Sequence, residues 1–254
     1  MTDKDIIKNN FSKYARHYDE YCKIQNICAA ELIKNAGNNG FKNILDIGCG
    51  TGNYTKILLD KFPKAAIKAV DISAKMTEIA KQKLGDKNIN FIVQDAENML
   101  LKERFDLITS NAAFQWFENL NSSILNYKIM LDKNGVILFS IFGPLTFYEL
   151  NESLKKINKD NSRIPSCNFI KQGELSRILK RFFKKSKIEE RIFKEKNRSL
   201  KELLKKIKYT GTRGNGLNKR NVWTSGMICK LEEIYKKDFN LTATYQVFFC
   251  RGIK

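Results

Sequence analysis

Three glycines at alternate positions, Gly48, Gly50 and Gly52, stand directly after a short apolar run. Glycine tolerates positive φ angles and lets a ligand approach the bare backbone. The apolar run at 43–47 is typical of a buried parallel strand, and the residues after the glycines favour a helix. A helix that begins at such a turn presents free N–H groups and the positive end of its dipole. The pattern therefore predicts a nucleotide-binding turn.

Acidic residues accompany this turn. Asp46 precedes it inside the first strand, and Asp71 closes the next predicted strand. A carboxylate at the position of Asp71 can accept hydrogen bonds from both hydroxyl groups of a ribose. The G-x-G-x-G spacing differs from the G-x-G-x-x-G of dinucleotide enzymes and from the P-loop, which ends in Gly-Lys-Ser/Thr. A glycine-rich turn without a ligand is the alternative interpretation.

The elements that must position these residues alternate between strand and helix along the chain. Apolar strands that alternate with helices form a parallel, doubly wound sheet, which makes the fold α/β. Near Pro144 the pattern changes to a helical and basic one. We expect one domain over 1–254, with an N-terminal helical cap segment at 1–40 and a basic helical insert at 145–183. The expected strands are 43–47, 66–71, 89–93, 105–110, 135–142, 186–195 and 243–250, and the expected helices include 20–36, 52–61, 74–84 and 121–131.

The glycine turn with its two acids resembles motif I of class I S-adenosylmethionine-dependent methyltransferases. The resemblance implies a seven-stranded Rossmann-like sheet with a helical lid, an antiparallel last strand, and S-adenosyl-L-methionine as the cofactor. In open α/β sheets ligands bind at the carboxyl ends of the strands. Taken singly, Asp71 could cap a helix, Asp95 could form a turn and Met76 could belong to the core. The implied cofactor-binding residues are Asp46, Gly48, Cys49, Gly50, Gly52, Asp71, Ile72, Met76, Asp95, Ala96, Glu97 and Asn111.

Composition excludes several other kinds of site. His17 is the only histidine, and the six cysteines form no C-x-x-C pair, so a zinc site, a Ser-His-Asp triad or a Cys-His pair is not expected. No apolar stretch approaches the roughly 18 residues of a membrane span, and the first residues are polar, so we expect a cytoplasmic protein. The formal net charge is +19. It reflects either a lysine-rich composition alone or an acidic partner.

The segment after the fourth strand, Asn111-Ala112-Ala113-Phe114-Gln115-Trp116, concerns the methyl acceptor. Methyltransferases that act on adenine or cytosine amines carry an Asn/Asp-Pro-Pro-aromatic segment there, so its lack of proline disfavours a nucleic-acid substrate. The segment resembles that of enzymes that methylate free carboxylates, such as trans-aconitate methyltransferases and the malonyl-acyl-carrier-protein O-methyltransferases of biotin synthesis. The N-terminal pattern from Phe11 to Asp19, followed by Gln25, is similar to the second family. So are the stretches 142–150, 203–211 and 244–247, although the bulky Phe114 departs from many members.

A carboxylate acceptor suits these residues, because a carboxyl group is already ionised at neutral pH and needs no general base. Catalysis then depends on alignment and on the exclusion of water. The candidate catalytic residues are Tyr18, Gln115 and Trp116, with ordinary packing as the alternative for Tyr18 and Trp116. Arg163 and Arg213 are guesses for binding the distal carboxylate.

Residues 171–187 predict an amphipathic helix that could meet an acidic partner. Leu175, Ile178, Leu179 and Phe182 fall on one face, and basic residues occupy the others. The resemblance implies an acidic acyl carrier protein that carries the malonyl group, although a solvated basic helix explains the charge equally well. Two other functions stay open: a carboxyl methyltransferase of the trans-aconitate type, and an RNA methyltransferase or RNA-binding protein. The sequence does not determine the oligomeric state. The basic side chains of this stretch are Arg177, Lys180, Arg181, Lys184 and Lys185.

Overall fold

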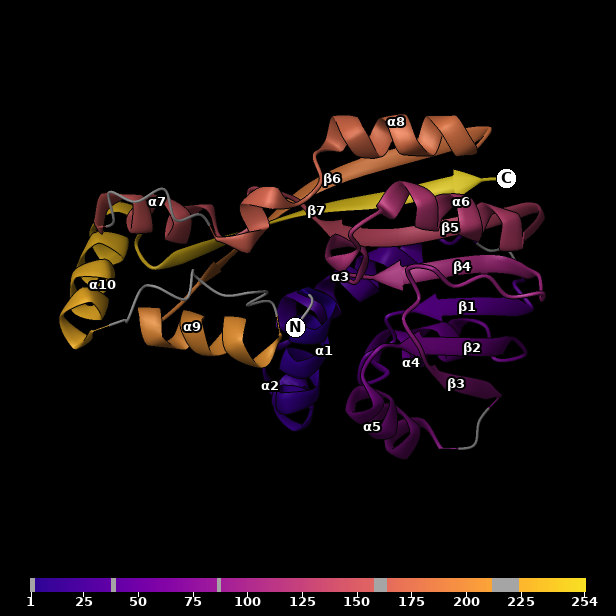
Figure 1. Ribbon diagram of the computed structural model, residues 1–254, viewed down its shortest axis with the longest axis horizontal. Helices are drawn as coiled ribbons and strands as arrows, with labels where there is room; N and C mark the ends of the chain where they lie inside the picture. The colour runs from indigo at the N-terminus through magenta and orange to yellow at the C-terminus, as the bar shows by residue number, and fades with distance from the viewer. Residues whose placement is uncertain (1–2, 38–39, 86–87, 158–163, 212–223) are drawn as a thin grey trace.

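The computed structural model describes residues 3–37, 40–85, 88–157, 164–211 and 224–254. Seven strands form one sheet in the order β3-β2-β1-β4-β5-β7-β6 (Figure 1). The first five strands run parallel, and β7 lies antiparallel between β5 and β6. The α/β fold class and the antiparallel last strand are therefore confirmed. The strands are β1 (Asn43–Ile47), β2 (Ala66–Asp71), β3 (Ile89–Val93), β4 (Phe105–Asn111), β5 (Leu131–Phe142), β6 (Lys185–Lys196) and β7 (Thr242–Ile253).

The helices agree with the expected alternation except at the N-terminus. The single helix expected over 20–36 is two helices, α2 and α3, separated at Cys22. A further helix, α1, precedes them and lies within the helical cap segment expected over 1–40. Short 3-10 helices lie at Ala15–His17, Phe114–Trp116 and Pro165–Asn168. The α-helices are α1 (Asp3–Tyr14), α2 (Tyr18–Tyr21), α3 (Lys23–Lys34), α4 (Asn53–Lys61), α5 (Ala74–Leu84), α6 (Leu120–Met130), α7 (Tyr148–Ile157), α8 (Gln172–Phe182), α9 (Leu200–Tyr209) and α10 (Ser225–Phe239).

Strand β5 separates the two halves of the core. Alternate side chains of a strand point to opposite faces of the sheet. Val136 and Leu138 belong to a cluster that includes buried residues of α3, α4, α7, α9 and α10. Ile137 and Phe139 belong to a second cluster, with buried residues of α6 and α8. Helices thus cover both faces of the sheet.

The second half of the chain extends the sheet on one side. Strands β6 and β7 run beyond the parallel strands toward α7 and α10, and α9 lies beside α1 near the N-terminus (Figure 1). Helix α8 packs against the sheet with the apolar face predicted for it: Leu175, Ile178, Leu179 and Phe182 are all buried. Within the described ranges, no helix is both long and apolar enough to cross a membrane.

The strand order creates a switch point beside β1. The chain moves outward to β2 and β3 on one side of β1, and then returns to β4 on the other side. At such a reversal the connecting segments diverge and leave a crevice at the carboxyl ends of the strands. The glycine turn of 48–52 follows β1 at this edge, so the fold places it where ligands bind.

Candidate active site

The glycine turn is built around backbone conformations that favour glycine. Gly48, Gly50 and Gly52 have φ angles of 72°, 54° and 83°. A Cβ atom on Gly48 would lie 2.4 Å from the Cβ of Ala113, so no side chain fits there. The amides of Gly48 and Cys49 donate to the Val70 carbonyl over 2.7 and 3.0 Å. The turn is therefore tied to the end of β2 and packed against the segment after β4.

Asp71 links the second strand to the same turn. Its Oδ2 accepts a hydrogen bond from the Gly50 amide at 2.9 Å, and its Oδ1 accepts one from the Ser73 amide at 2.8 Å. Burial raises the pKa of Asp71, and the two backbone hydrogen bonds act in the opposite direction. Each carboxylate oxygen keeps a further lone pair. Asp71 can thus accept hydroxyl groups of a ligand while it holds the turn.

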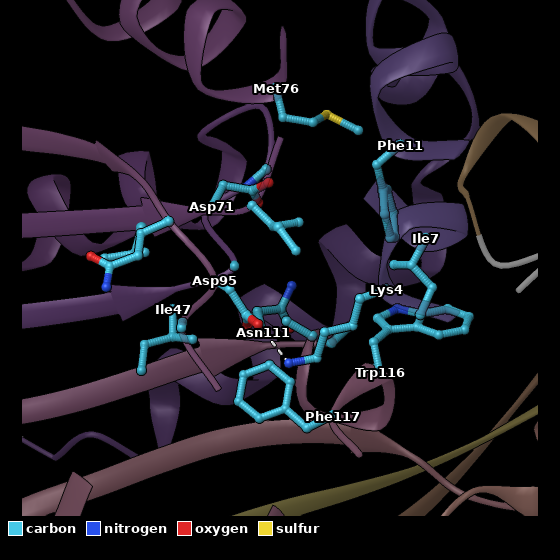
Figure 2. Close-up of a pocket in the computed structure, with 18 of the residues that line it drawn as sticks. Lys4, Ile7, Phe11, Ile47, Asp71, Met76, Asp95, Asn111, Trp116 and Phe117 are labelled. Atoms are coloured by element: carbon cyan, nitrogen blue, oxygen red, sulfur yellow. Dashed lines mark hydrogen bonds and ion pairs between the residues drawn. The ribbon is translucent and has the colours of Figure 1, made fainter. Parts of the chain in front are cut away.

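A cavity lies at this edge of the sheet, at the carboxyl ends of the strands where open α/β sheets bind ligands. Its wall combines the strand ends with helix α1 and with residues that follow β4. Figure 2 shows Ile7 and Phe11 on one side of the cavity, and Asp71 and Asp95 on the other. The sequence-predicted residues that line it are Tyr18, Gly48, Gly50, Asp71, Ile72, Met76, Asp95, Ala96, Asn111 and Trp116.

Other sequence-predicted residues do not line the cavity. Gly52 begins helix α4 behind the turn, and the thiol of Cys49 is buried. Gln115 folds back on its own segment, where its Nε2 donates to the Ala112 carbonyl at 2.6 Å. Asp46 and Glu97 lie beneath the wall and are described below. Arg163 and Arg213 lie outside the described residues.

Asn111 is held in a defined orientation at the end of β4. Its Nδ2 donates to the Gln25 carbonyl at 3.0 Å, and its Oδ1 accepts from the Ser140 hydroxyl at 2.7 Å. The next residue, Ala112, has a φ of 55°, which is uncommon for a residue with a side chain. The sharp change of direction there turns the following segment across the cavity. It places Trp116 in the wall.

Lys4 of α1 reaches the strand ends from the opposite side of the cavity (Figure 2). Its Nζ lies 2.6 Å from Asp95 Oδ2 and 2.5 Å from Glu97 Oε2. Burial lowers the pKa of Lys4, but the hydrogen bonds and charges of Asp95 and Glu97 outweigh it, so the pKa is raised. Any amine of a ligand that used Asp95 would therefore share this carboxylate with Lys4.

Aromatic rings close the cavity next to α1. The Phe11 ring centroid lies 6.2 Å from that of Trp116, in an edge-on arrangement, and 6.5 Å from that of Tyr18. The Trp116 indole Nε1 is buried and has no hydrogen-bond partner among the described residues. Burial, with a smaller effect of nearby Cys22 and Asp71, raises the pKa of the Tyr18 phenol. Both side chains can thus donate a hydrogen bond to an anionic ligand.

The sequence reasoning missed the contribution of α1. Lys4, Ile7 and Phe11 line the cavity, and their spacing puts them on one face of a helix. That spacing was the available signal. It was weak, because the helix is polar overall and its cavity-facing stripe contains a lysine. Phe117 and Ala113 also line the cavity, and Phe117 directly follows the predicted site residue Trp116.

Asp46 is buried under the glycine turn. Its Oδ2 accepts a hydrogen bond from the Thr55 hydroxyl at 2.6 Å. Burial raises the pKa of Asp46 to about 7, although the Thr55 hydrogen bond lowers it and the nearby Asp71 raises it further. Asp46 is therefore partly protonated at neutral pH, and its hydrogen bond with Thr55 joins the end of β1 to helix α4.

The raised pKa of Asp46 predicts a pH-dependent stability. A carboxyl whose pKa is about 4 in the unfolded chain and about 7 in the folded protein stabilises the fold fully only at low pH, and this contribution is lost as the pH rises from about 4 to about 7. Asp46→Asn, which stays neutral, should gain stability relative to the parent over that same range, with little further change above about pH 7. Chemical denaturation at pH 5, 6.5 and 8 measures this difference. A difference that stays constant across the three pH values would contradict the assignment.

Comparison with known proteins identifies relatives over nearly the whole chain. The family model described as "Methyltransferase domain" matches residues 45–139. Malonyl-[acyl-carrier protein] O-methyltransferase 2 of Ilyobacter polytropus is 39% identical over 241 residues, which cover 94% of this chain and 92% of that protein. The malonyl-[acyl-carrier protein] O-methyltransferase of Acetivibrio thermocellus is 33% identical, with 100% of this chain and 95% of that protein covered.

Solved structures share the fold at low sequence identity. The YcgJ protein from Bacillus subtilis aligns with a TM-score of 0.62 at 15% identity, covering 90% of this chain and 98% of that chain. The plantazolicin methyltransferase BpumL, solved with a desmethylplantazolicin analogue and S-adenosylhomocysteine (SAH), aligns with a TM-score of 0.58 at 17% identity. That alignment covers 99% of this chain and 95% of BpumL. These likenesses support the fold.

Proposed function

We propose, since the chain belongs to the family of malonyl-[acyl-carrier protein] O-methyltransferases, that it transfers a methyl group from S-adenosylmethionine to the free carboxylate of a malonyl thioester. The observation that carries this proposal is the cavity at the switch point, which the glycine turn and Asp71 line together with two hydrogen-bond donors, Tyr18 and Trp116. The carrier of the malonyl group is an acyl carrier protein.

The cofactor fits the residues along the strand ends. In the proposed arrangement the glycine turn receives the methionine part, and Asp71 accepts the ribose hydroxyl groups. Ile72 and Met76 contact the adenine ring, and Asp95 accepts from its amine alongside Lys4. Asn111, oriented by Gln25 and Ser140, faces the methionine part. When bound, S-adenosylmethionine supplies an electrophilic methyl group on a sulfonium.

The acceptor side needs donors and a dry environment. The hydroxyl of Tyr18 and the indole N–H of Trp116 are suited to hold the malonyl carboxylate, because both are neutral donors in the aromatic wall. A neutral donor orients the anion without neutralising it. The carboxylate is the nucleophile, and the reaction consumes two opposite charges, so a closed site of low dielectric favours it. These residues align the reactants and exclude water.

The product identifies the reaction. We expect purified protein to transfer label from methyl-labelled S-adenosylmethionine to malonyl-acyl carrier protein, and mild base to release the label as methanol. Transfer to free trans-aconitate instead would contradict the thioester substrate. Label on RNA that resists base would contradict carboxyl methylation altogether.

A basic surface would assist an acidic carrier protein. Basic side chains in α8 and directly after it face away from the core and are exposed. Within the described part of the chain, these side chains form no ion pair with a carboxylate. Such a surface speeds encounter with an anionic partner. These side chains are Arg177, Lys180, Arg181, Lys184 and Lys185.

This surface predicts a salt effect that depends on the substrate. Raising the ionic strength from about 0.02 to 0.2 M should raise KM for malonyl-acyl carrier protein several-fold, because screening shortens the reach of the charges. KM for malonyl-coenzyme A should change much less, since it offers no protein surface. Steady-state kinetics with both substrates measures the effect. An equal rise for both would show that the charge does not serve carrier recognition.

Methylation masks the terminal charge of the malonyl group, so that chain-elongating enzymes can accept it. This is the priming step of pimelate synthesis for biotin that the sequence resemblance implies. We place the activity in the cytoplasm as part of the same proposal.

A further inference from the structure

The carboxylate of Asp19 joins three segments of the chain. Asp19 belongs to the short helix α2 and directly follows Tyr18. Its Oδ1 accepts hydrogen bonds from the Thr51 hydroxyl at 2.5 Å and from Asn53 Nδ2 at 3.0 Å. Its Oδ2 accepts one from Lys83 Nζ at 2.6 Å. Asp19 thus connects α2 to the end of the glycine turn, to the start of α4 and to the end of α5.

The donors to Asp19 are themselves connected. Lys83 also donates to Asn53 Oδ1 at 2.7 Å, and Asn53 Nδ2 lies 3.2 Å from Asn26 Oδ1 on α3. Thr51 is 1% exposed, so its hydroxyl has a fixed position next to the turn. An isolated exposed ion pair contributes little. Here the Asp19 carboxylate accepts hydrogen bonds from the glycine turn and from helices α4 and α5. These hydrogen bonds together fix the position of the carboxylate.

Helix α2 is held on one side by α9, where Tyr21 stacks on Tyr209 with ring centroids 4.7 Å apart, and Asp19 links it to the glycine turn on the other. It contains four residues, too few to be stable without tertiary contacts. Tyr18 lies in the cavity wall, and its hydroxyl forms no hydrogen bond to any residue that the structure describes. The orientation of the phenol therefore depends on its packing against Phe11 and on where the backbone of α2 is fixed. Asp19, the adjacent residue, fixes that backbone relative to the glycine turn.

The glycine turn does not depend on Asp19 in the same way. Gly48 and Cys49 donate to the Val70 carbonyl, and Gly50 donates to Asp71. These hydrogen bonds hold the turn from the side of β2. Loss of the Asp19 carboxylate would therefore loosen the link between α2 and the turn, while the turn keeps its shape.

We propose that Asp19 is a positioning residue that fixes where Tyr18 lies relative to the glycine turn. The malonyl carboxylate held by Tyr18 then lies in line with the methyl group of the cofactor. This inference rests on the proposed function. Methyl transfer is sensitive to displacements of about 1 Å in the relative position of donor and acceptor. An aspartate suits the task because it accepts several hydrogen bonds and donates none.

A double-mutant cycle between Asp19 and Tyr18 tests this role. Asp19→Ala should lower kcat about tenfold or more, because alignment is lost, while the Kd for S-adenosylhomocysteine changes less than about threefold. In a Tyr18→Phe background the same change should lower kcat less than about twofold, because the residue on which Asp19 acts has lost its donor. Calorimetry gives the Kd, and single-turnover methylation of malonyl-acyl carrier protein gives the rate.

Controls separate positioning from general damage. Glu20→Gln removes a neighbouring carboxylate of α2 that pairs, within the described residues, with the exposed His17, so it should leave kcat and Kd unchanged. If Asp19→Ala does not fold, Asp19→Asn enters the same cycle with the same criteria. Equal losses of kcat in both backgrounds, or an unchanged kcat, would overturn the role of Asp19. Absence of any methyl transfer by the parent protein would instead overturn the proposed function, and this inference with it.

Discussion

Replacement of Gly48 by alanine is expected to weaken cofactor binding about 100-fold, and to lower kcat/KM to the same degree. The new Cβ would lie 2.4 Å from the Cβ of Ala113, in a backbone conformation with a φ of 72°. Left-handed strain and overpacking together cost about 2–5 kcal/mol, and about 2.8 kcal/mol corresponds to 100-fold in affinity. The turn must move to relieve the clash, and it moves into the space of the ligand. Calorimetric titration with S-adenosylhomocysteine measures the loss.

Gly37 offers a matched control. It has nearly the same φ angle, 73°, but a Cβ atom there would meet nothing within 4 Å, and it lies outside the cavity wall. Gly37→Ala should therefore cost on the order of 1 kcal/mol of stability, and leave cofactor affinity unchanged. If both variants bound the cofactor as tightly as the parent, the close approach at Gly48 would have no functional importance.

The second large effect is expected at Asp71. Asp71→Asn removes the charge that would accept the ribose hydroxyl groups, and it turns an amide NH₂ toward a backbone N–H. Hydrogen bonds to a charged group contribute about 1.5–3 kcal/mol each, so the Kd for S-adenosylhomocysteine should rise by about 100-fold. The fold should survive, because the Val70 carbonyl still holds the turn. Calorimetry measures the Kd for S-adenosylhomocysteine, and thermal denaturation measures the stability of the fold.

Asp106 is the control for Asp71. Its carboxylate also accepts two backbone hydrogen bonds, from Lys42 at 2.7 Å and from Asn43 at 3.1 Å. It lies at the beginning of β4, at the opposite edge of the sheet from the cavity. Asp106→Asn should thus alter stability without altering Kd. A similar rise in Kd for both variants would mean that Asp71 affects binding only through the fold.

The strand ends were predictable because local patterns define them. Apolar runs that stop at glycine or aspartate mark both the strand and its exit, and parallel strands bring their exits to one edge. The sequence therefore located Asp71, Asp95 and Asn111 beside the glycine turn. It also predicted the apolar face of α8, since that pattern lies within a single helix.

Contacts between distant segments were not predictable. Nothing local to Lys4 indicates that it pairs with Asp95 and Glu97, because that pairing depends on where α1 packs. Gln115 was expected in the acceptor site, and it instead donates to the Ala112 carbonyl within its own turn. The segment begins at Ala112 with a positive φ, a conformation that the residue type does not suggest.

Strand order has a consequence for how the chain is made. β6 pairs in the sheet with β7 alone among the described strands, and β7 follows it only after α9 and α10 have been synthesised. A ribosome therefore exposes β6 with both of its hydrogen-bonding edges open, at a stage when neighbouring nascent chains could pair with it. Its many charged side chains, in KSKIEERIFKEK, oppose such premature association until β7 arrives.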